Sequence, residues 1–309
     1  MDRRTFLTLL TATPALGVVA ACGSDAIDDA AAPAAAPDET LPPATDPPAE
    51  LSTPPTTDSP TGTAVPASDA PGDLVLSYTE SGGFTTREYA FQDPPLVLIT
   101  AGGQFITTAV TTQEFPPPAV PQHLVRPIDP AGIDAIVSSA ADAGLLADVE
   151  YERDDLIADA STATLAISTD EGTWTHEAYA LGIGGGPGLD GGESTDRRRA
   201  LADFLDSLVA DPGSLIGAGE LGEPSAWEPP AYQIVAEPAP EADPSQPEPT
   251  VLDWPGSSGV DLATASGCTE VSAESLGPIL ADADALTRFR QGGVTYAVTV
   301  RPAYPGREC

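Results

Sequence analysis

The stretch Thr162-Ala-Thr-Leu-Ala-Ile-Ser168, together with Thr173-Trp-Thr-His-Glu-Ala-Tyr-Ala-Leu181, decides the fold class of this chain of 309 residues. Both runs are rich in residues that favour strands, and Asp170-Glu-Gly172 between them is a turn signal, so the stretch predicts a β-hairpin. A helix is predicted downstream, from Thr195 to Ala210. Its apolar residues recur at the spacing of one helix face, at Leu201, Phe204, Leu205, Leu208 and Val209. Hairpins with interspersed helices indicate an α+β body on an antiparallel sheet.

Further elements are predicted on both sides of this stretch. Strands are expected at Leu74–Thr79, Leu96–Thr100, Phe105–Ala109 and Val294–Val300, the second and third forming a hairpin. A helix should begin with Asp129 as N-cap and Pro130 at its first position, and end near Gly144. Another helix is expected around Leu276–Leu286. The body should therefore hold an antiparallel sheet with about three helices.

The last predicted strand alternates apolar and other residues. Its apolar residues on one face are Val294, Tyr296, Val298 and Val300. Strict alternation is typical of a strand that covers a core with one face and meets water with the other. We therefore expect the opposite face of this strand to be solvated.

Composition divides the chain into five segments. We expect a signal peptide at 1–21, a lipidated Cys with a disordered tether at 22–72, and the main α+β body at 73–236. A Pro-rich linker at 237–250 then leads to a small C-terminal segment at 251–309. About 60 residues are marginal for an independent core, so we expect the last segment to dock on the body.

The N-terminus carries basic residues, then an apolar run, then small residues before a Cys. Arg3 and Arg4 precede Phe6 and Leu7, and the run ends at Val19-Ala20-Ala21-Cys22. A stable membrane span needs roughly 20 strongly apolar residues, which this Thr- and Gly-containing run does not offer. It is typical of the apolar part of a signal peptide.

This stretch resembles the signal peptides of bacterial lipoproteins that use the twin-arginine pathway. Arg3, Arg4, Phe6 and Leu7 match the export signal, whereas Asp2 and Thr8 depart from it, so the general secretory route stays the alternative. Val19, Ala20, Ala21 and Cys22 match the lipobox. The resemblance implies that Cys22 receives lipid and becomes the new N-terminus. Two or three acyl chains, such as palmitate, would hold it on the outer face of the cell membrane.

Residues 23–72 have the composition of a tether. They contain no aromatic and no basic residue, and are mostly Ala, Pro, Thr, Ser and acidic residues. Such a segment buries too little apolar surface to offset its ordering entropy, so we expect disorder with polyproline II character. As a flexible coil it would span roughly 40 Å.

The charge balance is strongly acidic. The chain has 47 acidic and 12 basic residues, all of the latter Arg, and a formal net charge of -35. Binding to nucleic acid depends on basic side chains that neutralise phosphates, so we exclude a nucleic-acid partner. The absence of Lys excludes mechanisms that depend on Lys. Solubility outside the cell is the simple explanation of the acidity, and binding of multivalent cations is the alternative.

Two Cys remain besides Cys22, namely Cys268 and Cys309. In an exported protein such a pair predicts a disulfide, and the wide spacing disfavours a metal or redox pair. The surrounding residues are similar to the C-terminal part of uncharacterised secreted and lipoprotein families from high-GC bacteria. The matching residues are Cys268, Leu286–Phe289, Gly292–Tyr296, Val300–Pro302, Pro305 and Cys309, with Ala303 and Tyr304 departing. The resemblance implies a disulfide-closed element and no particular activity.

The sequence contains no recognised catalytic motif. Its two His residues, His123 in a Pro-rich loop at 115–127 and His176 in a strand, lack metal-ligand spacing and are expected to be structural or exposed. Gly186–Gly191 fits G-x-G-x-x-G, but Pro187 and neighbouring acids favour a flexible loop over a dinucleotide site. Arg197–Arg199 are expected to neutralise neighbouring acids, with a small anion site as the alternative.

Two acidic groups are weak candidates for Ca²⁺, because neither has the fixed ligand spacing of a recognised Ca²⁺ loop. They are Asp190, Glu193 and Asp196, and Asp154, Asp155 and Asp159.

We expect no cofactor. The leading hypothesis is a non-catalytic, membrane-anchored module that binds or scaffolds in the cell envelope, with a protein or glycan partner. The alternative is a hydrolase with an acidic pair, for example one like a glycoside hydrolase. Stabilisation by Ca²⁺ is a third possibility.

Overall fold

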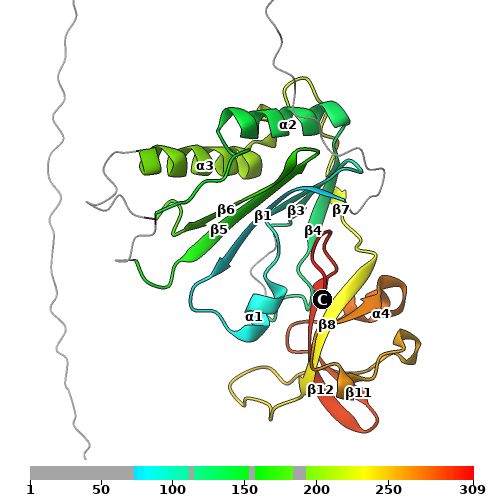
Figure 1. Ribbon diagram of the computed structural model, residues 1–309. Coiled ribbons are helices and arrows are strands. Elements are labelled where there is room, and N and C mark those ends of the chain that lie inside the picture. The colour runs from blue at the N-terminus through cyan, green and yellow to red at the C-terminus, as the bar shows by residue number, and fades with distance from the viewer. Residues whose placement is uncertain (1–72, 111–114, 153–156, 184–192) are drawn as a thin grey trace, which may run out of the picture. The chain divides into compact units, whose positions relative to one another are not determined.

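Two sheets and four helices make up the part of the chain that the computed structural model describes, residues 73–110, 115–152, 157–183 and 193–309 (Figure 1). These residues belong to one unit, Asp58–Cys309. The α+β class with antiparallel sheets is confirmed. The expected signal, lipobox and tether lie outside the described residues, and with them Arg3, Arg4, Phe6, Leu7, Val19, Ala20, Ala21 and Cys22.

The first sheet is antiparallel and has the order β6-β5-β1-β2-β3-β4-β7. Its strands are β1 (Leu74–Gly82), β2 (Val97–Thr100), β3 (Gln104–Thr108), β4 (His123–Pro127), β5 (Ser161–Thr169), β6 (Gly172–Tyr179) and β7 (Ser225–Ala226). Both predicted hairpins are confirmed, since β2 pairs with β3 and β5 with β6. The prediction of a loop at 115–127 is wrong for its last five residues, because these form β4, which pairs along the whole of β3. Pro127 is tolerated because it is the last residue of that strand.

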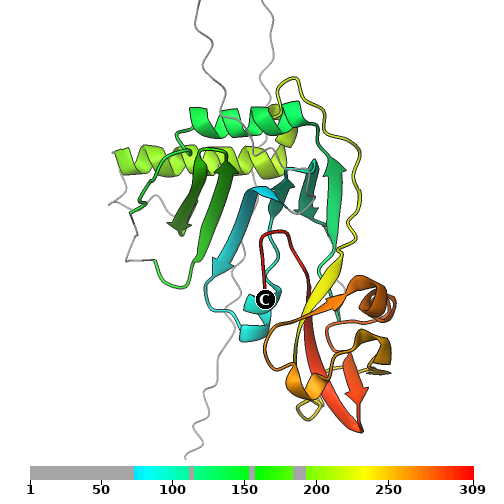
Figure 2. The same cartoon turned by 45° about the vertical axis from the view of Figure 1, so that its right-hand side comes forward.

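Two helices cover one face of the first sheet, α2 (Pro130–Asp142) and α3 (Glu193–Ala210) (Figures 1 and 2). As predicted, Asp129 caps α2, and its carboxylate accepts a hydrogen bond of 2.8 Å from the Gly132 N–H. Four residues of the predicted apolar face of α3 are buried in the core beneath it. The fifth, Val209, is 51% exposed, because it lies at the edge of that face, next to the fully buried Leu208.

The second sheet has the order β10-β8-β12-β11-β9, and only β9 and β11 pair in parallel. Its strands are β8 (Ala231–Pro238), β9 (Val251–Asp253), β10 (Thr269–Ser272), β11 (Arg288–Gln291) and β12 (Val294–Pro302). The predicted boundary between residues 236 and 237 falls inside β8. Helix α4 (Ala273–Leu280) and the edge-to-face pair of Trp254 and Phe289, 5.4 Å apart, help to build its core.

Helix α4 is shorter than the helix predicted around Leu276–Leu286. Its N-cap is Ser272, and it ends at Leu280. Beyond it, the Asp284 carboxylate accepts hydrogen bonds of 2.9 Å from the Leu286 N–H and the Thr287 hydroxyl. These local bonds hold a turn where the helix was expected, because a short polar side chain competes with helical bonds.

A short helix that the sequence did not predict, α1 (Arg87–Gln92), lies against β12. The Gln92 amide donates to the Val300 carbonyl at 3.0 Å, and the Arg301 guanidinium lies 4.4 Å from the centre of the Phe91 ring. Arg301 is therefore only 6% exposed. The expectation of a solvated outer face on β12 is thus wrong at its C-terminal end.

The inner face of β12 follows the predicted alternation in part. Tyr296 and Val300 are buried, Val298 is half-buried, and Val294 is 45% exposed at the start of the strand. Three short 3-10 helices complete the described elements, at Pro212–Ser214, Gly256–Ser258 and Leu262–Thr264. Within the described residues, no helix has the length and apolar character needed to cross a membrane.

Candidate functional site

The residues that follow β12 reach the face of the first sheet that α2 and α3 leave uncovered. Successive side chains of a strand point to opposite faces. Val97 and Ile99 of β2 pack beneath the helices, whereas Leu98 packs with Tyr304 of the C-terminal tail. Tyr304 is 4% exposed and also contacts Ile106 of β3. The tail thereby joins the two sheets through one buried ring.

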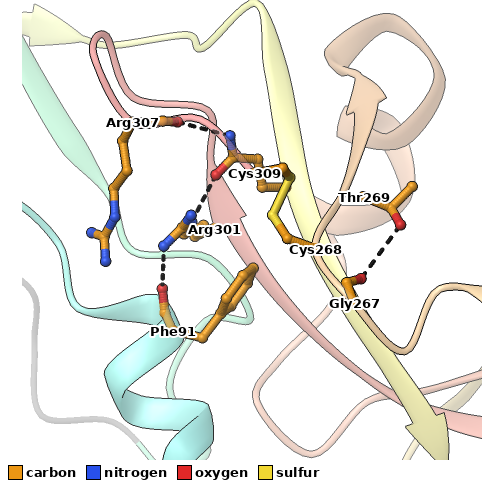
Figure 3. The surroundings of a disulfide bond; sticks show 8 residues. Phe91, Gly267, Cys268, Thr269, Arg301, Arg307 and Cys309 are labelled. Carbon is orange, nitrogen blue, oxygen red and sulfur yellow. Dashed lines mark hydrogen bonds between the residues drawn. A yellow bond between two sulfur atoms is a disulfide. The ribbon is translucent and has the colours of Figure 1, made fainter.

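The predicted disulfide between Cys268 and Cys309 is present and holds the end of this tail beside the second sheet (Figure 3). The Gln233 amide, on β8, donates to the Arg307 carbonyl at 2.9 Å and accepts from the Arg301 Nε at 2.8 Å. The Arg307 guanidinium donates to the Asp93 carbonyl at 2.7 Å. The tail is therefore tied to both sides of the junction by covalent and polar contacts.

Aromatic rings surround Tyr304. The Trp227 ring is stacked on it with centroids 5.9 Å apart, and His123 meets it edge-on at 5.2 Å. His123 is 3% exposed. Its Nδ1 donates to the Pro121 carbonyl at 3.2 Å, because a carbonyl can only accept. Its Nε2 then accepts from the Tyr304 hydroxyl at 3.3 Å. His123 was predicted to be structural or exposed, and the structure shows that it is buried and structural.

Burial lowers the pKa of His123 to about 4, and the bond to Pro121, which raises the pKa, does not offset it. Burial also raises the pKa of the Tyr304 hydroxyl, which therefore keeps the proton that it donates. Both effects arise because a charged ring is poorly solvated inside the protein. The junction is thus held by neutral rings.

We expect the free energy of unfolding to fall between pH 7 and pH 5, with a contribution from His123. The unfolded side chain titrates near pH 6.5 and the folded one near 4, so the unfolded chain takes up the proton first. The loss begins as the pH falls through about 6.5, is complete below about 4, and amounts to about 2 kcal/mol at pH 5. Urea unfolding of the wild type and of His123→Asn at both pH values measures it. Equal pH dependence in the two proteins would contradict this expectation.

The other His is buried in a separate network. His176 on β6 donates from Nε2 to the Leu145 carbonyl at 2.7 Å, and its Nδ1 accepts from the Tyr151 hydroxyl at 2.9 Å. Burial raises the pKa of Tyr151 to about 12, so this hydroxyl keeps its proton. Because both ring nitrogens are bonded inside the protein, His176 is structural, as predicted.

A groove of about 620 Å³ lies beside the ring cluster, and we call it the aromatic groove. Among the residues that line it are Pro118, Pro121, His123, Trp227, Tyr232 and Asp282. Backbone hydrogen bonds fix one wall, because the Ala119 N–H donates to the Ala283 carbonyl at 3.1 Å and the Ala285 N–H donates to the Pro117 carbonyl at 2.8 Å. The Pro-rich segment is therefore held against the turn that follows α4.

Two ring donors line the aromatic groove without a hydrogen-bond partner among the described residues, the Trp227 indole N–H and the Tyr232 hydroxyl. Trp254, by contrast, donates its indole N–H to the Val260 carbonyl at 3.2 Å. Burial, and then the charge of Glu228, raise the pKa of Tyr232, which keeps its hydroxyl protonated. Both residues are half-buried and line the groove, so their donors are available to a ligand that offers acceptors.

Among the described residues that line the aromatic groove, the charged side chains are acidic, Asp282 and Asp284, and none is Arg. Asp284 is occupied by the turn after α4. Asp282 is exposed and has no partner within the described part of the chain. The groove therefore combines proline and aromatic side chains, two donors without a partner among the described residues, and one free negative charge.

A second hollow, of about 870 Å³, is lined by Glu80, Asp93, Tyr89 and Arg307 among others. Phe84 at its rim is 97% exposed. Burial, and to a smaller extent the charge of Glu80, raise the pKa of the Asp93 carboxyl, and Arg307 opposes this rise. Glu80 accepts a hydrogen bond from Tyr78. This hollow is where the structure brings together carboxylates of the kind that the hydrolase hypothesis requires.

Each acidic group considered for Ca²⁺ falls partly outside the described residues, with Asp154 and Asp155 in one group and Asp190 in the other. The Gly186–Gly191 stretch lies outside them as a whole. Asp196 pairs with Arg199 at 2.8 Å. Across residues 73–110, 115–152, 157–183 and 193–309, no group of three or more His, Cys, Asp or Glu side chains could hold a metal ion.

The Arg197–Arg199 run serves two purposes. Arg199 neutralises Asp196, as predicted. Arg198 instead donates to the carbonyls of Tyr179, Ala180 and Glu152 at 2.8 to 3.2 Å. This arginine ties the start of α3 to the end of β6, so the expectation that it neutralises an acid is wrong.

Sequence reasoning named His123 but missed the other two rings that line the groove, Trp227 and Tyr232. Trp227 and Tyr232 flank Pro229 and Pro230, and an aromatic pair around prolines in a chain with three Trp was the available signal. Their relation to Asp282 and Pro118 depends on strand pairing between distant segments, which no local pattern contains. Comparison of the chain with protein-family models, with curated proteins and with solved structures found no match.

Proposed function

We propose that the protein is a lipid-anchored, extracytoplasmic module that binds a ligand in the aromatic groove without transforming it. The observation that carries this proposal is the pair of unpartnered donors, Trp227 and Tyr232, on the wall of a groove whose His123 is already bonded on both ring nitrogens. A group that is bonded internally and has a pKa of about 4 is unsuited to proton transfer at neutral pH. The groove therefore offers binding groups rather than catalytic ones.

The anchoring half of the proposal rests on Cys22 and on the residues before it. Arg3, Arg4, Phe6 and Leu7 would direct export, and Val19, Ala20 and Ala21 would direct lipidation and cleavage at Cys22. The acidic tether of residues 23–72 would then hold the body clear of the membrane. The disulfide that closes the tail is in keeping with an oxidising location outside the cytoplasm.

Replacing Cys22 by alanine is expected to remove the lipid anchor. In the native host, the wild-type protein should fractionate with membranes and incorporate labelled palmitate, whereas Cys22→Ala should do neither, because acyl chains supply the membrane affinity. Cys268→Ala serves as a control that removes a different Cys and should still take up label. Labelling of Cys22→Ala at the wild-type level would contradict the anchoring proposal.

The hydrolase is the second candidate, and the Glu80 and Asp93 hollow is the observation that favours it. A carboxyl of raised pKa, that of Asp93, lines the same hollow as a second acidic side chain, and glycosidases use such a pair of acids. Incubation of the full chain with cell-wall polysaccharides and measurement of new reducing ends decide between the candidates. Release of reducing ends by the wild type that is lost in Asp93→Asn would overturn the non-catalytic proposal; no release supports it.

A further inference from the structure

We infer that the occupant of the aromatic groove is an extended, proline-containing peptide segment that bears Lys or Arg side chains. This inference rests on the proposed function and names the partner class for the same groove. It follows from three properties of the groove: the shape of its walls, its free hydrogen-bond donors and its charge.

The walls are rich in rigid side chains. Prolines, among them Pro118, Pro121 and Pro229, line the groove together with the rings of Trp227 and Tyr232. The Trp227 ring is fixed from behind by its stack on Tyr304. Aromatic-lined grooves of this kind accept the ridges of a polyproline II helix, which loses little entropy on binding because it is already extended.

The free donors call for backbone acceptors. A polyproline II segment makes no internal hydrogen bonds, so its carbonyls are all available. The Trp227 indole N–H and the Tyr232 hydroxyl can each donate to one of them, and neither has a partner among the described residues. An apolar ligand such as an acyl chain would leave both donors unpaired, so the peptide is favoured.

The charge calls for a basic partner. Asp282 lies free on the groove wall, and Glu228 is close enough to raise the pKa of Tyr232. No Arg is among the described residues that line the groove, so no basic side chain of its wall offsets this charge. With a net charge of -35, the molecule attracts cationic segments and repels acidic ones.

The same charge argues against the chain's own tether as the occupant. Residues 23–72 are rich in Pro but carry acidic and no basic residues. A tether bound in the groove would bring like charges together beside Asp282 and Glu228. A basic segment of another envelope protein matches both the shape and the charge.

The test uses the full chain with Cys22→Ser and a fluorescent decapeptide of alternating Pro and Arg, followed by anisotropy. We expect saturable binding that weakens as salt rises, and no binding of the same peptide with Glu in place of Arg. Tyr232→Phe keeps the ring and removes the donor, and Trp227→Phe replaces the indole by a smaller ring without a donor, so each should weaken binding about 3- to 10-fold. Melting curves of both variants confirm that they fold.

Asp282→Asn should weaken binding about 3-fold and reduce its salt dependence, because it removes the free charge. The matched control is Asp170→Asn, an exposed acid at the turn between β5 and β6, which should bind like the parent chain. Equal loss in both Asn variants would show a general charge effect and overturn the assignment to the groove.

The remaining outcomes separate this inference from the proposed function. If neutral oligosaccharides bind, and Trp227→Phe weakens that binding while the Arg peptide does not bind, the peptide assignment falls and the binding module stands. If neither probe binds the parent chain, the inference and the proposed function both fail.

Discussion

Replacement of Tyr304 by alanine is expected to lower the free energy of unfolding by about 3 to 5 kcal/mol, the range for removal of a buried aromatic ring. Tyr304 is 4% exposed and packs on Leu98 and Ile106 of the first sheet, although it belongs to the tail of the second. Its loss leaves a cavity at the junction and takes away the ring on which Trp227 is stacked. Urea unfolding followed by circular dichroism and by Trp fluorescence measures the change.

Two variants separate packing from hydrogen bonding at this position. Tyr304→Phe keeps the ring but removes the hydroxyl that donates to His123 at 3.3 Å, and should cost about 1 kcal/mol. Tyr89→Ala removes a tyrosine that is 59% exposed, and should stay within about 0.5 kcal/mol of the wild type. If Tyr304→Ala were no more destabilising than Tyr89→Ala, the tail would not hold the sheets together.

Removal of the disulfide by the double substitution of Cys268 and Cys309 with serine is expected to cost about 4 kcal/mol. The bond closes a loop with a sequence separation of 41, and the cost follows from the greater freedom of the uncrosslinked unfolded chain. The second effect is local, because the tail that carries Tyr304 and Arg307 would fray from its end. Chemical denaturation of the variant and of the reduced wild type should give the same loss. Unchanged stability in both would contradict the expectation.

The disulfide also offers a test of the export route. A protein carried by the twin-arginine pathway folds in the reducing cytoplasm before its disulfide can form. The reduced chain should then still fold, with lower stability, because two hydrophobic cores remain. A reduced chain that fails to fold would favour the general secretory route. That route is the alternative because Asp2 and Thr8 depart from the twin-arginine signal.

The elements that the sequence predicted are those in which the decisive interactions are close in the chain. The β5–β6 hairpin is specified by its turn and by strand-forming residues on both sides. Helix α2 begins where Asp129 and Pro130 place it, and α3 follows its apolar spacing. Caps, turns and periodicity act over a few residues, so one sequence suffices to find them.

The elements that the sequence missed depend on partners far away in the chain. Strand β4 lies in a Pro-rich stretch and exists because β3 pairs with it. Helix α1 contributes Phe91, on which Arg301 lies some 210 residues later. An arginine in an alternating strand predicts a solvated face, and only the helix that covers it makes burial favourable.

For the candidate site, the sequence alone determined the disulfide pair, the acidic charge, the absence of Lys and the expectation that Cys22 is lipidated. The sequence assigned Tyr304 no role; it only showed that Tyr304 departs from the C-terminal pattern of the families that this tail resembles. The tertiary structure decided that this tyrosine is the buried contact between two sheets, and that Pro118, Trp227, Tyr232 and Asp282 share one groove. The physical reason is that strand pairing and burial join segments more than a hundred residues apart, whereas composition and spacing report only what neighbours in the chain can do.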